Sequence, residues 1–164
     1  MGPRMERVGI GGAGMYQVRI ERTLECPTAV VKADTTRRDF ATLWGPLLDE
    51  VWAFLAETPG LRTDGHNVMV YRNTVPGVEI AVEVGVQVTR TFTPTGRVVP
   101  SALPATEVAA TIHSGPVAEI GGAYEAIGDF CRAEHRRMTG LWWEVYGDPH
   151  PDHFDIAVYS ELRP

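Results

Sequence analysis

The sequence predicts an α+β fold: duplicated β-α-β-β units forming one antiparallel sheet with two helices on one face. Three observations support this prediction. Similar pieces of sequence recur at a nearly constant spacing, two segments have the apolar period of helices, and one segment alternates like a strand. A chain of 164 residues, 44% of them hydrophobic, is long and apolar enough to bury a core of this kind.

The spacing of the repeat is the most specific of these observations. The repeated pieces are 75 to 77 residues apart: Pro27 and Pro104, Val70-Tyr71 and Val145-Tyr146, Ile80-Ala81-Val82 and Ile156-Ala157-Val158. A spacing this steady indicates a duplicated unit. We expect a flexible, glycine-rich leader over residues 1–15 and a single domain over 16–164, with repeats at about 16–90 and 91–164.

Each half is predicted to open with an extended segment, continue with a helix and close with two strands. The ranges are 18–33, 37–57, 67–73 and 78–89 in the first half, and 97–113, 117–135, 141–147 and 154–162 in the second. Helix 37–57 has a long apolar stripe, and Pro46 is expected to kink it or start a fresh turn. Helix 117–135 has Gly121-Gly122 in its first turns, where bare backbone indicates a close approach by another element or a ligand. Strand 78–89 alternates valine and isoleucine on a face that must be buried.

Composition excludes several classes of function. The net charge is −6 and no dense run of lysine and arginine occurs, so no direct nucleic-acid partner is expected. No apolar run approaches the roughly 20 residues that span a membrane, so we expect a soluble, cytoplasmic protein with no membrane partner. Cys26 and Cys131 lack the spacing of a zinc site or a disulfide framework, and no cofactor is predicted.

The stretch from Leu141 to Pro149 places one carboxylate among three large aromatic residues. Alternation along a strand puts Trp142, Glu144 and Tyr146 on one face and Trp143 on the other. A carboxylate between aromatic walls suits a flat, hydrophobic, positively charged guest. The alternative interpretation is that Glu144 lies on a solvated sheet face with incidental aromatic neighbours.

The second half resembles a known family. It reads LPATEVAATIHSGP at 103–116, then a predicted helix, then WEVYGDP at 143–149. A strand ending His-x-Gly-Pro, a helix, and Trp-Glu-x-Tyr followed by Asp-Pro resembles the GyrI-like small-molecule-binding domain. That module also serves as the effector-binding domain of AraC- and MerR-type multidrug regulators, and its fold is SOUL-like in outline. The resemblance implies a pocket between the helices for bulky, planar, often cationic compounds, although Val117 stands where an aromatic commonly follows Gly-Pro.

The resemblance places Glu144 at the centre of this pocket, with Trp143 before it and Tyr146 two residues on. Alternation favours Trp142 as the neighbour of Glu144, and a bulge at Gly140 would alter that facing. The repeat spacing of 75 equates Glu144 with Met69 and Tyr146 with Tyr71. The expected ligand-binding residues are Glu144, Trp142, Trp143, Tyr146, Tyr71, Trp44, Trp52, Met69, His113 and Tyr124.

Two functions of different classes fit these residues. The first is a stand-alone protein that binds a hydrophobic planar small molecule and sequesters or senses xenobiotics. No helix-turn-helix precedes Tyr16, so transcriptional control would require a partner chain. The second, implied by some stand-alone GyrI-like proteins, is a hydrolase that opens the cyclopropane ring of alkylating natural products. Glu144 would then be the general base, and Tyr146 or Tyr71 the proton donor.

Two further interpretations are less favoured. The residues His150, Asp152, His153 and Asp155 include sound metal ligands, but they fall in a proline-interrupted turn where polar residues are ordinary, so no metal site is predicted. His113 ends a strand, and SOUL haem-binding proteins share this fold in outline, which makes haem binding an alternative. A hydrogen-bonded histidine at a strand end is favoured over it.

Overall fold

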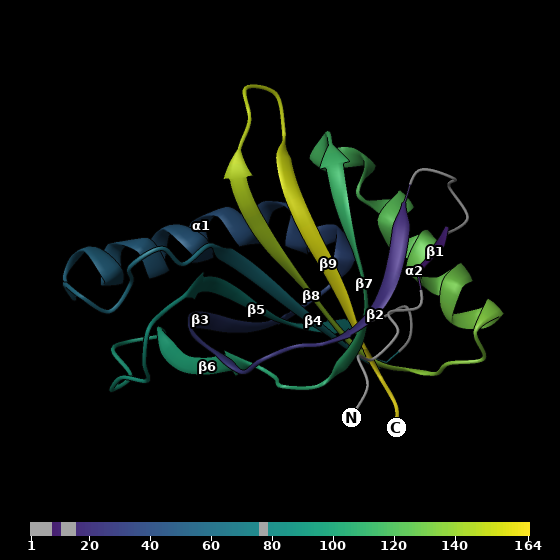
Figure 1. The fold of residues 1–164 in the computed structure, drawn as a ribbon. Coiled ribbons are helices and arrows are strands. Elements are labelled where there is room, and N and C mark those ends of the chain that lie inside the picture. The colour runs from purple at the N-terminus through teal and green to yellow at the C-terminus, as the bar shows by residue number, and fades with distance from the viewer. Residues whose placement is uncertain (1–7, 11–15, 76–78) are drawn as a thin grey trace. The chain divides into compact units, whose positions relative to one another are not determined.

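The computed structural model describes residues 8–10, 16–75 and 79–164 (Figure 1). The predicted α+β class and the antiparallel pairing of the strands are confirmed. The elements follow in the order β1 Val8–Ile10, β2 Gln17–Arg22, β3 Cys26–Thr35, α1 Arg37–Ala56, β4 Asn67–Val75, β5 Glu79–Gln87, β6 Val99–Leu103, β7 Glu107–Gly115, α2 Gly121–Ala133, β8 Met138–Pro149 and β9 Phe154–Leu162.

The chain forms two compact units. The central unit is residues 24–105, and the terminal unit combines residues 1–23 with 106–164. The strand order is β4-β5-β3-β6 in the central unit and β8-β9-β7-β2 in the terminal unit, where β1 adds beyond β2. Each unit therefore has the same succession of one strand, one helix and a pair of strands, which is the predicted duplicated β-α-β-β unit.

The two predicted extended segments are each divided between the units. Segment 18–33 forms β2 and β3, and segment 97–113 forms β6 and β7, which Pro104 separates. β2 pairs with β7, and β6 pairs with β3. Each unit thus takes one strand from the other half of the sequence. Sequence periodicity does not reveal this exchange of strands, because an extended segment has the same pattern whichever unit it pairs with.

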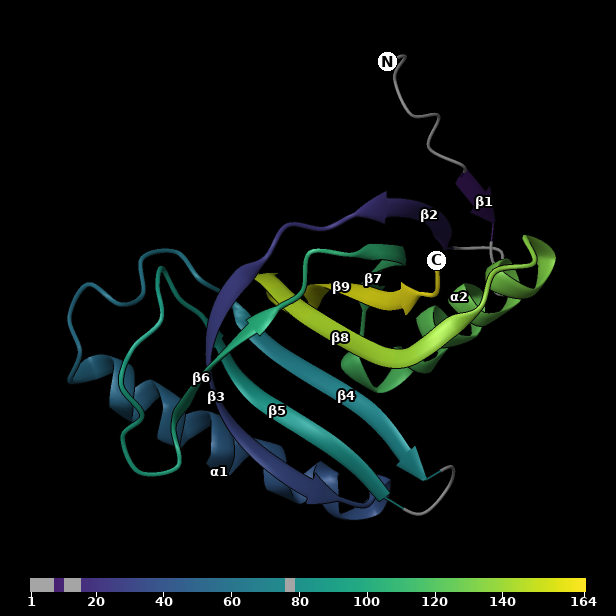
Figure 2. The same ribbon diagram turned by 90° about the horizontal axis from the view of Figure 1, so that it is seen from below.

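In the central unit, α1 packs on β5 and β3 (Figure 2). The helix begins where the Thr36 hydroxyl accepts the backbone N–H of Asp39, a typical N-cap. It continues past Pro46 rather than ending there. Its buried face contacts the alternate residues of both strands that point toward it, and together they form a core of Ala29, Val31, Leu47, Val51, Leu55, Val84 and Val86.

In the terminal unit, the predicted helix 117–135 is divided into a short 3₁₀ turn, Val117–Glu119, and α2. The helix covers a core that includes Val18, Ala109, Ile127, Ile156 and Val158. The lack of a side chain at Gly122 leaves room for Tyr16, because a Cβ at Gly122 would lie 3.1 Å from two atoms of the Tyr16 side chain. The close approach is therefore made by a tyrosine of the same unit.

Strand register revises how the two repeats correspond. Tyr71 lies opposite Val82, and Glu144 lies opposite Val158. Val82 and Val158 are 76 residues apart and correspond, so the pairing equates Glu144 with Tyr71, and not with Met69 as the spacing of 75 implies. The difference arises in the connections between the paired strands: 14 positions separate Glu144 from Val158, whereas 11 separate Tyr71 from Val82, so the terminal unit has three more residues between these pairs. The register shift between Met138 and Trp142, where Gly140 has φ 94°, lies before Glu144 and leaves the pairing from Trp142 to Tyr146 regular. At this register position the terminal unit has a carboxylate and the central unit has a phenol.

Some predictions concern the edges of the described regions. Val8–Ile10 lies in the expected leader and forms β1, antiparallel to β2. The rest of residues 1–15, and Val78 at the start of a predicted strand, lie outside the described residues. Within the described ranges, no helix combines the length and the apolar composition that crossing a membrane would require.

Candidate functional site

Three predicted site residues share one face of β8. Trp142, Glu144 and Tyr146 lie opposite Ser160, Val158 and Ile156 of β9. Val158 and Ile156 belong to the core beneath α2, and Trp142 and Tyr146 pack against that core. The alternation of the strand therefore directs the Glu144 side chain to the face that α2 covers.

Glu144 is a buried carboxylate, only 4% exposed. The Tyr146 hydroxyl donates to its Oε1 at 2.7 Å, and the Tyr124 hydroxyl of α2 donates to its Oε2. The Tyr124 ring also contacts Trp142, with centroids 4.8 Å apart. Both hydroxyls are neutral donors, and these two hydrogen bonds orient the carboxylate. We call Tyr124, Trp142, Glu144 and Tyr146 the Glu144 cluster.

Tyr146 is held as a neutral hydrogen-bond donor. Burial raises the pKa of its hydroxyl well above the ordinary 10.0, and the negative charge of Glu144 raises it further. The Tyr146 ring meets the edge of Phe154, with centroids 6.3 Å apart, and Phe154 is 38% exposed. Phe154 was not among the predicted site residues. The predicted pair of strands 141–147 and 154–162 carries the signal for it, since antiparallel pairing sets the start of β9 against the end of β8.

We expect the stability of the protein to fall as the pH rises above 10.0, in part through Tyr146. Its folded-state pKa is raised, so its contribution is complete below the unfolded pKa of 10.0 and is lost as the pH rises toward the folded value. Urea unfolding at neutral and alkaline pH measures this loss, which should be smaller in Tyr146→Phe. The pKa of Tyr16 and of Tyr159 is raised as well, so some pH dependence should remain. An unchanged slope in Tyr146→Phe would contradict the prediction.

Trp143 points to the opposite face of β8. It is 2% exposed and stacks on Tyr159, which lies directly across from it on β9, with centroids 5.3 Å apart and planes 16° apart. The question of which tryptophan neighbours Glu144 is therefore answered by alternation. Trp142 shares the face of Glu144, and Trp143 is a packing residue of the sheet.

His113 is fixed by two hydrogen bonds and is buried. Its Nε2 lies 2.8 Å from the carbonyl oxygen of Pro116, which can only accept, so the proton is on Nε2. Its Nδ1 then accepts from the Tyr16 hydroxyl at 2.7 Å. Neither nitrogen offers a lone pair to an iron atom in this arrangement, which gives the haem interpretation no support. The histidine connects the end of β7 to Tyr16 and to the turn before α2.

The remaining predicted residues lie in the central unit. The Tyr71 hydroxyl contacts the Met69 sulfur at 3.4 Å, and its ring meets the edge of Phe40. Trp52 donates to the Asn67 side chain at 3.0 Å, and the Arg62 guanidinium lies over its ring. Trp44 is partly exposed on α1. Tyr71 and Met69 are thus brought together, whereas Trp52 has partners of its own.

No family model matches the sequence, and no curated protein matches it. Solved structures do. The C-terminal domain of EcmrR has 17% identity and a TM-score of 0.74, over 91% of this chain and 98% of that one. A longer EcmrR chain, in a complex with DNA, has 18% identity to this chain and a TM-score of 0.75. The match covers 91% of this chain and 58% of the EcmrR chain.

Two further structures have lower identity. SAV2435 bound to tetraphenylphosphonium has 9% identity and a TM-score of 0.66, over 89% of this chain and 93% of that one. A hydrolase from Listeria innocua has 12% identity and a TM-score of 0.56, over 89% and 91%. At these identities the likeness concerns the fold. With the EcmrR domain and SAV2435 as neighbours, this chain has the GyrI-like fold that its sequence resemblance implies.

Proposed function

We propose that this chain binds small molecules, and that the Glu144 cluster takes bulky, planar organic cations of the kind found among xenobiotics. The observation that carries the proposal is the buried carboxylate of Glu144, held by the hydroxyls of Tyr124 and Tyr146 beside the Trp142 ring. Aromatic faces attract cations, and the carboxylate supplies the opposite charge.

The cost of removing water from the Glu144 carboxylate and from the ligand favours large aromatic cations. Burying a carboxylate is costly unless hydrogen bonds satisfy it, and the two tyrosine hydroxyls supply such bonds. A cation whose charge is spread over aromatic rings loses little hydration when it leaves water, so it suits an apolar environment better than an ammonium ion does. The structural neighbour SAV2435 has been seen with tetraphenylphosphonium, a bulky cation whose charge is enclosed by four aromatic rings and whose shape is tetrahedral rather than planar. The net charge of −6 adds a long-range attraction.

A pair of ligands that differ only in the sign of their charge tests the proposal. Tetraphenylphosphonium and tetraphenylborate have the same shape, so calorimetric titration of each isolates the effect of charge. A planar cationic dye and an anionic dye of equal size, followed by fluorescence, extend the test to flat ligands. We expect the cation of each pair to bind at least about tenfold more tightly, and the difference to shrink at higher salt. Equal affinities would contradict an acidic site.

In a regulatory role, ligand binding would have to reach DNA through other protein segments. The EcmrR chain that occurs in a complex with DNA is longer than this one and includes a domain like it. We propose that, if this chain senses its ligand for transcription, the signal reaches DNA through a segment other than this domain. A role in sequestering the ligand requires no such segment.

Hydrolysis is the second candidate function, and the hydrogen bond between Tyr146 and Glu144 favours it. Glu144 would remove a proton from a water molecule while the oxygen of that water forms a bond to a cyclopropane carbon. The strained carbon–carbon bond would break, and Tyr146, which stays protonated at neutral pH, would give a proton to the departing electron pair. The proton that Glu144 took from water would then pass to Tyr146 along their hydrogen bond, which restores both groups. The neighbour from Listeria innocua described as a hydrolase adds support.

Incubation with a cyclopropane-containing alkylating compound, followed by mass spectrometry, separates binding from hydrolysis. Hydrolysis predicts a product heavier than the substrate by one water, formed repeatedly by each protein molecule. Recovery of unchanged compound in a stoichiometric complex would leave binding as the function and would contradict hydrolysis.

A further inference from the structure

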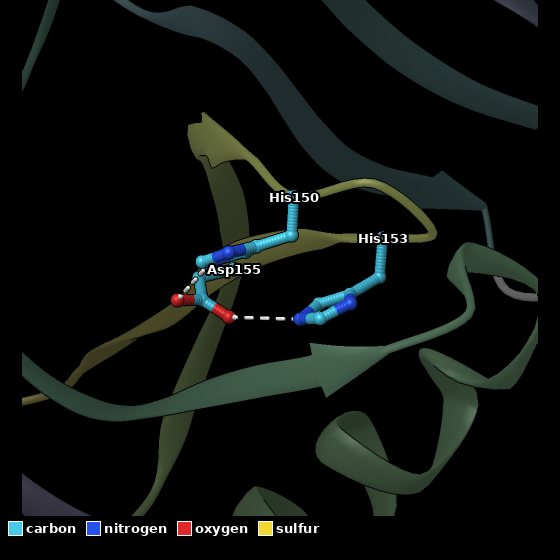
Figure 3. Close-up of side chains that lie close together, drawn as sticks. All are labelled: His150, His153 and Asp155. Carbon is cyan, nitrogen blue, oxygen red and sulfur yellow. Dashed lines mark hydrogen bonds and ion pairs between the residues drawn. The ribbon is translucent and has the colours of Figure 1, made fainter.

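A cluster of metal-ligating side chains lies at the turn between β8 and β9, and none of them belongs to the Glu144 cluster (Figure 3). His150 and His153 come from the turn and Asp155 from β9, and one ligand atom of each lies within 4.8 Å of the others. The imidazole rings are stacked, with centroids 4.6 Å apart, and both direct an edge at the Asp155 carboxylate. We propose that these three side chains bind one divalent transition-metal ion of the zinc type.

The distances from each histidine to the Asp155 carboxylate are close to those between the ligands of a tetrahedral ion. Zinc bound at about 2.0–2.1 Å in a tetrahedron separates its ligand atoms by about 3.3 Å. The Nε2 of His150 lies 3.1 Å from Oδ2 of Asp155, and the Nε2 of His153 lies 3.7 Å from Oδ1. One ligand atom of each residue lies within 4.8 Å of the others, so rotation of the side chains would have to draw the donors together around one ion. A fourth position stays open for water.

Neighbouring groups orient two of the ligands. The Nδ1 of His153 lies 2.7 Å from Oδ1 of Asp152, and a carboxylate can only accept, so the proton is on Nδ1. The lone pair of Nε2 is then directed at Asp155, where two electron-rich atoms face each other and a cation between them is stabilising. The Ser114 hydroxyl donates to Asp155 at 2.8 Å and fixes the carboxylate. Such outer contacts are typical of bound metal ions.

The backbone restricts His150 before any ion binds. Pro149 and Pro151 flank it, and its N–H donates to the carbonyl of His153 at 2.8 Å, which closes the turn. Nε2 of His150 now hydrogen-bonds Asp155, and it becomes a ligand when its proton moves to Nδ1. Two imidazoles with one carboxylate suit zinc, nickel or copper, whereas calcium and magnesium prefer oxygen ligands alone.

Calorimetric titration with zinc chloride tests the site on protein freed of any polyhistidine tag and of metal by dialysis against a chelator. We expect one ion per chain, with affinity lost at least about tenfold in Asp152→Asn and further in His153→Gln and Asp155→Asn. The control is His135→Asn, which removes an exposed histidine at the end of α2. Its φ of 54° is one that asparagine adopts readily, so this variant should fold and bind zinc like the original.

Nuclear magnetic resonance of the imidazoles gives a second measurement that needs no variant. Zinc should shift the signals of His150 and His153 and leave those of His66, His113 and His135 in place. Equal zinc affinity in the original protein and in His153→Gln would overturn the proposal, as would a metal-induced shift confined to other histidines. Binding of calcium in preference to zinc would overturn it as well, because it would exclude the imidazoles as ligands.

Discussion

Glu144→Gln is expected to weaken the binding of tetraphenylphosphonium by about 1–3 kcal/mol, roughly 5- to 150-fold in Kd. The change removes the charge and keeps the shape of the side chain. Glutamine can still accept one tyrosine hydroxyl through its oxygen, and the other hydroxyl can turn to accept from its amide. The protein should therefore stay folded. Titration of both proteins with tetraphenylphosphonium and with tetraphenylborate measures the effect, which should be confined to the cation.

The matched control for this variant is Glu125→Gln. Glu125 is exposed on α2, one residue after Tyr124, so the variant loses the same charge from the protein without changing the cluster. It should bind the cation as the original does. If hydrolysis occurs, Glu144→Gln should also lower turnover by ~10²–10⁴. Unchanged affinity in Glu144→Gln, with binding abolished in Trp142→Ala, would show that aromatic contacts alone hold the ligand.

Trp143→Ala is expected to destabilise the protein by about 3–5 kcal/mol, the largest change in stability that we predict. The indole is buried and stacked on Tyr159, so its removal loses apolar burial and leaves a cavity. A loss of this size is a large part of the stability of an ordinary domain. Urea unfolding measures it, and expression as inclusion bodies would be consistent with it.

Trp142→Phe is the matched variant for the neighbouring position. Trp142 is half-buried against Tyr124, and phenylalanine keeps an aromatic ring there, so stability should change far less than in Trp143→Ala. Cation binding should weaken, because the larger indole attracts a cation more strongly than a benzene ring does. A similar loss of stability in both variants would contradict the conclusion that Trp143 contributes more to the stability of the fold than Trp142 does.

Much of the fold could be predicted because its signals are local. The apolar stripe of α1, the alternation of β5 and the repeat of Ile80-Ala81-Val82 as Ile156-Ala157-Val158 each depend on neighbouring residues or on simple comparison. The division of segment 18–33 into β2 and β3 could not be predicted in this way. It depends on pairing with strands far along the chain, and those partners leave no mark on local periodicity.

The candidate site shows the same division. Alternation correctly placed Trp142 with Glu144 and apart from Trp143, because a strand has a fixed period of two. The correspondence of Glu144 with Met69 failed, because the hairpin of β8 and β9 has three more residues between its paired positions than the hairpin of β4 and β5, and local spacing does not record which residues pair. The stacking of His150 on His153 was not predictable either. It depends on the conformation of one turn, and the turn looked like an ordinary polar loop in the sequence.

The crossing of β2 into the terminal unit has a consequence for the order in which the chain folds. The central unit is continuous in sequence and can complete its strand pairs as soon as its last residue leaves the ribosome, whereas β2 must wait for β7. Closing so long a loop in an unfolded chain carries an entropic cost. The folded central unit removes most of that cost, because it pairs Cys26 with Leu103 and so holds the two ends of the loop together. Just beyond them the N–H of Thr23 donates to the carbonyl of Thr106 at 2.8 Å, and β2 and β7 leave this point as neighbours. Synthesis from the N-terminus therefore favours completion of the central unit first, and the Glu144 cluster forms last, after β8 and β9 have been made.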